Sequence, residues 1–144
     1  MRLLAVDPGE KHIGVAVSDP SGIIARPLTT LMHESRAKDA ERLVALAREH
    51  EVEGIVLGLA LNAQGEAGPQ ARRAERLVEA LRAITDVPVI PHDESFSSAT
   101  AQTLMLASGK KRRERRAQIH AVAAAALLQS YLDANPLPPA PPTG

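Results

Sequence analysis

The sequence predicts a single α/β domain in which helices flank a mixed five-stranded sheet. Three observations support this fold class. The first thirty residues hold three short apolar or β-rich segments that are separated by tight-turn residues. The later part alternates apolar runs with segments of helical periodicity. The length of 144 residues and the apolar content of 44% suit one domain with its own core and exclude wholesale disorder.

The turn residues near the N-terminus predict an antiparallel meander. The apolar run Leu3–Val6 ends at Asp7-Pro8-Gly9, and the β-rich segment His12–Ser18 ends at Asp19-Pro20-Ser21-Gly22. A third strand is expected over Ile23–Thr30. Because the connections are so short, neighbouring strands must run in opposite directions.

The rest of the chain predicts parallel strands joined by helical crossovers. Apolar residues three and four apart predict helices over 37–50, from Pro69 past Leu81, over a short stretch from Ser97 or Ser98 to Ala107, and from the basic stretch to Asn135. Short apolar runs predict the two further strands, Ile55–Leu57 and Val87–Pro91. We therefore expect a folded domain over residues 1–135.

Composition excludes several kinds of protein. Cysteine is absent, so disulfides, thiol catalysis and cysteine zinc sites are excluded. The only aromatic residues are Phe96 and Tyr131, which predicts an aliphatic core and disfavours recognition by base stacking. No segment resembles a signal peptide or a membrane span, so we expect a cytoplasmic protein. Five prolines in residues 136–144 predict a disordered tail.

A neutral total charge hides one basic segment. Residues 110–116 carry a net charge of +5, so the rest of the chain carries −5. Cations are poorly placed at a helix N-terminus, which favours a flexible loop that grips phosphates over a solvated helix start. We expect this segment to bind a polyanion.

Carboxylates follow two of the predicted strands. Asp7 follows the first apolar run, and Asp93 and Glu94 follow the fifth strand. Sites in such sheets form at the carboxyl ends of strands, where neighbouring carboxylates need a cation between them. Mg²⁺ and Mn²⁺ prefer carboxylate oxygens. The alternatives are that Asp7 is only a turn residue, and that Asp93 caps a helix while Glu94 is solvated.

The histidines and one further aspartate invite plainer interpretations. His120 lies beside Ile119 in the last predicted helix, where a histidine is most often half-buried and structural. His92 adjoins the acidic pair and is a weaker ligand candidate. His12, His33 and His50 are expected at the surface or in turns, and Asp19 is expected to have a structural role in its turn.

Four blocks stand in order along nearly the whole chain. They are residues 4–19 (LAVDPGEKHIGVAVSD), Gly58-Leu59-Ala60-Leu61-Asn62 with Gly65, Asp93-Glu94-Ser95-Phe96-Ser97-Ser98, and the helix from His120 through Gln129 to Leu132. Together they resemble the YqgF/RuvX family of the RNase H-like superfamily. The resemblance implies an RNase H-like fold. It also implies a nuclease, for which Holliday junctions and the precursor of 16S ribosomal RNA are the proposed substrates.

The resemblance also implies the site. Asp7 and Glu94 match two catalytic carboxylates, while His120 stands where the family has an aspartate. Two metal ions would be held by Asp7, Glu94 and His120, with Asp93 in an auxiliary place. Because imidazole suits transition metals, His120 favours Mn²⁺ over Mg²⁺ as the cofactor.

Nucleic acid, as branched DNA or precursor ribosomal RNA, is the expected partner. The expected contacts are Lys110, Lys111, Arg112, Arg113, Arg115, Arg116, Lys11 and Asn62. With so few aromatic residues, we expect recognition of shape and phosphate rather than of base sequence. A homodimer would suit cleavage of both strands of a junction, and a monomer would suit trimming of RNA; the sequence leaves this choice open.

Two other functions fit parts of the sequence. A non-catalytic RNA-binding factor in ribosome assembly would explain the replacement of an acidic residue by His120. An actin-like phosphotransferase also carries an Asp-x-Gly turn like Asp7-Pro8-Gly9, but it needs two lobes around its nucleotide, and this chain has room for one.

Overall fold

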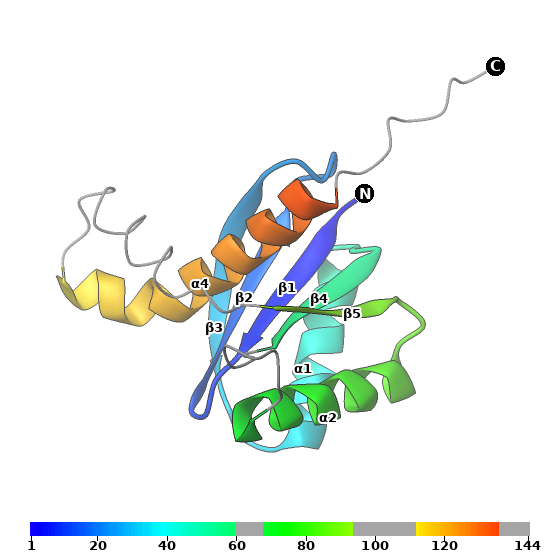
Figure 1. Cartoon of the computed structure of the whole chain (residues 1–144), viewed down its shortest axis with the longest axis vertical. Coiled ribbons are helices and arrows are strands. Elements are labelled where there is room, and N and C mark those ends of the chain that lie inside the picture. Colours follow the sequence, from blue (N-terminus) through cyan, green and yellow to red (C-terminus); the bar gives the residue numbers. More distant parts are fainter. Residues whose placement is uncertain (60–67, 94–111, 136–144) are drawn as a thin grey trace.

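The structure is a computed structural model, and it describes residues 1–59, 68–93 and 112–135, with only the backbone for 112–118. Strands β1 (Leu3–Pro8), β2 (His12–Ser18) and β3 (Ala25–Met32) form the predicted antiparallel meander. Strands β4 (Gly54–Leu59) and β5 (Val89–Asp93) add two parallel pairings. The strand order is β3-β2-β1-β4-β5, so the mixed five-stranded sheet is confirmed and β1 lies at its centre (Figure 1).

Two strands begin later than expected, and local hydrogen bonds explain both shifts. The backbone amides of Ile23 and Ile24 donate to Asp19 Oδ1 at 2.7 and 2.9 Å, so both residues belong to the turn and β3 starts at Ala25. The amide of Val87 donates to Thr85 Oγ1 at 3.2 Å, and β5 starts two residues later at Val89. In both places a backbone amide donates its hydrogen bond to a side-chain oxygen instead of to a neighbouring strand.

Two helices cover one face of the sheet, and their first residues follow from the sequence. Helix α1 (Arg36–Glu49) begins after Ser35, whose hydroxyl accepts from the Lys38 amide at 3.2 Å. Helix α2 (Pro69–Ile84) begins at Pro69 as predicted, because proline needs no amide partner in the first turn. The predicted short helix ending at Ala107 lies outside the described residues, as does the tail 136–144.

The opposite face carries helix α4 (Arg112–Ala134), which crosses β2 and β1 in Figure 1. Its start differs from the sequence prediction, because residues 112–116 of the basic segment are helical rather than a loop. Arginine is a good helix former, and the helix dipole opposes cations by only about 0.3–1 kcal/mol each. The second half of α4 packs on the sheet, so the helix extends through the basic residues.

The side chains of the strands alternate between two apolar layers. Leu4 and Val6 of β1 pack toward α1 and α2, whereas Leu3 and Ala5 pack toward α4. The α4 layer also holds Ala16, Val56, Ala124, Leu127 and Leu128, and both layers are aliphatic as predicted. Within the described part of the chain, every helix is too short or too polar to cross a membrane.

Candidate functional site

Asp7 lies at the carboxyl end of the central strand. Strand alternation places Asp7 on the same face as Leu3 and Ala5, which is the face that α4 covers. The residue is half-buried and pairs across the ladder with Gly14 of β2. A carboxylate is thereby held by a strand that has hydrogen-bonded neighbours on both sides.

Gly14 lets α4 approach this end of the sheet closely. A Cβ atom at Gly14 would lie 1.8 Å from the backbone oxygen of His120 and 3.0 Å from the amide nitrogen of Ala121. No side chain fits there, so the glycine sets how near the helix backbone lies to the strand. Gly14, which pairs with Asp7 across the sheet, is therefore also the residue that the backbone of His120 contacts.

His120 on α4 lies beside His12 and is influenced by the charge of Asp7. Its ring stacks on that of His12, with centroids 4.9 Å apart and planes inclined by 17°. Burial lowers the pKa of His120, the nearby His12 lowers it further, and the charge of Asp7 opposes both. The neutral ring is therefore favoured, and it carries a lone pair that can bind a metal ion.

Sequence reasoning missed His12, which it placed at the surface. The available signal was strand alternation. His12, Gly14 and Ala16 share one face of β2, and Ala16 is buried under α4. Once the first residue of β2 is known, His12 must lie on the face that carries Asp7.

The two residues at the end of β5 lie on opposite faces. His92 Nε2 is 3.3 Å from Ser130 Oγ, and its ring meets Tyr131 edge-on at 5.4 Å, so His92 faces α4. Asp93 follows it and, by alternation from buried Val89, lies on the face of α1 and α2. The structure therefore does not bring Asp93 to the face that carries Asp7, and its metal role stays a prediction.

Several predicted site residues have no described side chain. Glu94, Asn62, Lys110 and Lys111 lie outside the described residues, and only the backbone is described for Arg112, Arg113, Arg115 and Arg116. Lys11 is exposed in the turn between β1 and β2. The predicted contacts to nucleic acid therefore remain predictions.

Asp19 has the structural role that its sequence predicts. Its carboxylate accepts hydrogen bonds from the Ser21 hydroxyl and from the amides of Ile24 and Ile23. These bonds, with that of Ser21 the strongest, hold the pKa of Asp19 well below its usual range. These hydrogen bonds stabilise the turn before β3.

The donor set fits a divalent cation in part. Asp7 supplies carboxylate oxygens and His120 a neutral imidazole, which suit Mn²⁺ and similar ions. No three acidic or histidine side chains gather closely enough to hold a metal ion within residues 1–59, 68–93 and 119–135. Glu94, the third ligand predicted from the sequence, lies outside the described residues.

Similar solved structures share the fold. RuvC from Thermus thermophilus, in complex with a Holliday junction substrate, matches 93% of this chain and 95% of its own with a TM-score of 0.60 at 17% identity. The Holliday junction resolvase of fowlpox virus matches 93% of this chain and 99% of its own with a TM-score of 0.59 at 12% identity. The RNase H-like fold predicted from the sequence is thus confirmed.

Closer relatives in sequence are provisionally described as pre-16S rRNA nucleases. One from Roseiflexus is 39% identical over 93% of this chain and 95% of its own. One from Anaeromyxobacter is 42% identical over 92% of this chain and 97% of its own. Residues 1–134 match the family described as RuvX, Holliday junction resolvase. With that match over nearly its whole length, the chain belongs to the RuvX family.

Proposed function

We propose that this chain is a divalent-metal-dependent endonuclease that hydrolyses phosphodiester bonds in structured nucleic acid. One observation carries the proposal. Asp7, at the end of the central strand, pairs with Gly14, the residue against which the backbone of His120 on α4 packs, so a carboxylate and an imidazole come together on the α4 face of the sheet. Membership of the RuvX family supports the reaction class. The substrate is four-way DNA junctions, the precursor of 16S ribosomal RNA, or both.

Asp7, His120 and Glu94 would hold the cations, with Mn²⁺ favoured by the imidazole. When bound, a pair of such ions supplies an activated water as nucleophile and stabilises the charge on the leaving oxygen. The described residues prepare the site for them. Asp7 brings negative charge on a fixed strand, and burial keeps His120 neutral so that its lone pair is free.

The arrangement around His120 also fixes its position. His12 stacks on one side of the ring, and the contact at Gly14 sets the height of the helix backbone above β2. The stacking holds the ring of His120, and the contact at Gly14 holds the backbone of the same residue. His12 is therefore a positioning residue in this proposal.

A side-by-side cleavage assay tests the function. Purified protein is incubated with four-way DNA junctions and with precursor 16S ribosomal RNA, with Mn²⁺, with Mg²⁺ and with a chelator, and the oligomeric state is measured in the same buffer. We expect cleavage that needs metal and disappears in Asp7→Asn while binding persists. Cleavage that survives in Asp7→Asn or in chelator would overturn the proposal.

His120 motivates a second candidate, a non-catalytic RNA-binding factor. An imidazole where the resemblance implies an aspartate reduces the negative charge available to metal ions. If the wild-type protein binds precursor RNA but cleaves neither substrate with either metal, this candidate replaces the nuclease. The same assay therefore separates the two functions.

A further inference from the structure

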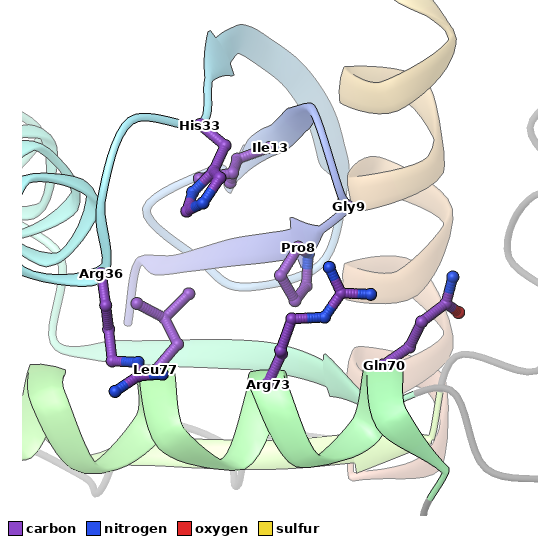
Figure 2. A pocket seen from close by; sticks show the side chains of 8 residues that line it. All are labelled: Pro8, Gly9, Ile13, His33, Arg36, Gln70, Arg73 and Leu77. Atoms are coloured by element: carbon purple, nitrogen blue, oxygen red, sulfur yellow. The ribbon is translucent and has the colours of Figure 1, made fainter.

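A pocket of about 180 Å³ lies beside the turn that follows Asp7, on the face of α1 and α2 (Figure 2). Its polar lining comes from three elements: His33 after β3, Arg36 at the start of α1, and Gln70 and Arg73 on α2. Pro8 and Gly9 form its edge toward the sheet. Drug-sized ligands occupy about 300–1,000 Å³, so this volume suits a smaller group.

The lining is cationic and poor in competing acids. Arg36 forms no ion pair with any residue whose side chain is described, and no acidic residue lines the pocket. Residues from the first turns of α1 and α2 both line the pocket, and Gly68, the N-cap of α2, makes no side-chain cap bond. Two guanidinium groups in a lining that holds no acidic residue suit an anion, and guanidinium matches phosphate oxygens in particular.

Arg73 forms an exposed ion pair with Glu10. Its guanidinium donates to Glu10 Oε1 at 3.3 Å, and both side chains are largely exposed. Figure 2 shows Arg73 rising from α2 toward Pro8 and Gly9. Exposed ion pairs contribute about 0–1 kcal/mol, so a phosphate can displace Glu10 at little cost.

The ring of His33 is held in place by the buried carboxylate of Asp39. Asp39 is almost fully buried and contacts His33 Nδ1, and it also accepts from the Glu34 amide at 3.1 Å and from Arg42 at 2.8 Å. Burial raises the pKa of Asp39, but the bonds from Glu34, His33 and Arg42 outweigh it and keep the group ionised. The imidazole is thus anchored through one nitrogen at the pocket wall.

The pocket and the candidate catalytic site share one turn of the chain. Gly9 is two residues from Asp7, so their Cα atoms are at most about 7.6 Å apart. Asp7 faces α4 while the pocket opens on the other face, so the two lie on either side of the turn at the end of β1. Resting on the nuclease function proposed above, we propose that this pocket binds a backbone phosphate of the nucleic acid, adjacent to the phosphodiester held at Asp7.

The test measures binding without catalysis. The affinity of a labelled oligothymidylate is measured by fluorescence anisotropy over a range of salt, in chelator, for the wild type, Arg36→Gln, Arg73→Gln and Glu10→Gln. Arg72→Gln is the matched control, because Arg72 precedes Arg73 on α2, loses the same charge and does not line the pocket. Thermal unfolding of each variant confirms the fold.

We expect Arg36→Gln and Arg73→Gln each to weaken binding and to reduce the salt slope, by no more than about 0.7 for the one phosphate that the two arginines share on this single-stranded probe. Glu10→Gln should tighten binding, because it frees Arg73. Equal behaviour of Arg72→Gln, Arg73→Gln and Arg36→Gln would overturn the proposal. So would equal affinity for thymidine monophosphate, inorganic phosphate and the oligomer, which would make this a site for small phosphate ligands.

The outcome is independent of cleavage. If the protein cleaves in the nuclease assay but the arginine variants bind normally, the pocket proposal fails and the nuclease stands. If no cleavage occurs and the arginine variants still weaken binding, the nuclease fails and the pocket stands as a nucleic-acid contact.

Discussion

At position 120, the imidazole stacks on the ring of His12 and feels the charge of Asp7, while the backbone of the same residue lies against Gly14 of β2. These neighbours act on it in opposite directions. Burial and then His12 favour the neutral ring, whereas Asp7 favours the charged one. The lowered pKa shows that burial and His12 prevail, and a neutral imidazole is the form that binds a metal.

The choice of metal tests this residue. We expect wild-type activity to prefer Mn²⁺ over Mg²⁺, and His120→Asp to raise relative activity with Mg²⁺ because a carboxylate adds negative charge. His120→Ala should abolish cleavage and keep the fold, since the residue lies beside the core rather than in it. Initial rates with each metal measure the effect. If His120→Ala cleaves at the wild-type rate with either metal, the imidazole is structural, and the carboxylates Asp7 and Glu94 remain as the proposed ligands.

The lowered pKa of His120 also predicts a pH dependence of stability. Between its folded pKa and the ordinary value of 6.5, the unfolded chain binds a proton that the folded chain does not. The free energy of unfolding therefore decreases as pH falls below 6.5 toward the folded pKa. Denaturant unfolding of the metal-free protein at a series of pH values measures this decrease. His120→Asn should flatten the curve in that window, and an identical curve would contradict the assignment.

At the level of elements, the contact between α4 and β2 determines the geometry of the site. Gly14→Ala adds a methyl group 1.8 Å from the His120 oxygen, so the helix must move. Overpacking of this kind costs about 1–3 kcal/mol, and we expect cleavage to fall by more than the loss of folded protein explains. Thermal unfolding and cleavage rates compare the variants. Gly68→Ala is the control, because its added methyl meets nothing within 4 Å; equal losses of activity in both variants would show that helix placement is not limiting.

The basic segment 110–116, which leads into α4, is predicted to bind the phosphates of nucleic acid. Neutralising Lys110, Lys111, Arg112, Arg113, Arg115 and Arg116 should weaken binding of nucleic acid and flatten its salt dependence, by about 0.7–0.9 for each lost phosphate contact. We predict these charges to lie at the surface, where single charges contribute little, so stability should hardly change. Glu114→Gln makes the segment more basic and should steepen the salt dependence. An unchanged slope in the neutralised variant would mean that this segment does not touch the ligand.

For the whole molecule, the sequence predicts the architecture well because turns and periodicity are local signals. The motif Asp7-Pro8-Gly9 ends the first run within two residues of its structural end, and Pro69 begins α2 where expected. The errors arise where a side chain competes with the backbone. Asp19 takes the amides of Ile23 and Ile24, and nothing in the apolar pattern of those isoleucines reveals it.

The site was harder to predict, because it depends on contacts between distant segments. Asp7 and His120 came from resemblance and position, but the stack of His12 on His120 needs the tertiary approach of α4 at Gly14. His92 and Asp93 lie on opposite faces because β5 continues to Asp93, two residues beyond its predicted end at Pro91. The pocket joins Arg36 to Arg73 across two helices, and no local pattern links them.

The domain boundary gives one prediction for the whole chain. Residues 136–144 follow the last described residue of the fold, and the family match ends at 134. Deletion of these nine residues should leave the midpoint of thermal unfolding and the cleavage rate unchanged. Differential scanning calorimetry and the cleavage assay measure both. A clear drop in the midpoint would place part of the domain's stability in this segment.

The central place of β1 has a kinetic consequence. Its backbone is hydrogen-bonded to β2 and β4 along most of its length, so local opening of the sheet edges does not release it. Its amides should exchange with solvent deuterium only when the entire domain opens. The carboxylate of Asp7 therefore keeps its position until the molecule as a whole unfolds, and heat should inactivate the site and melt the sheet together.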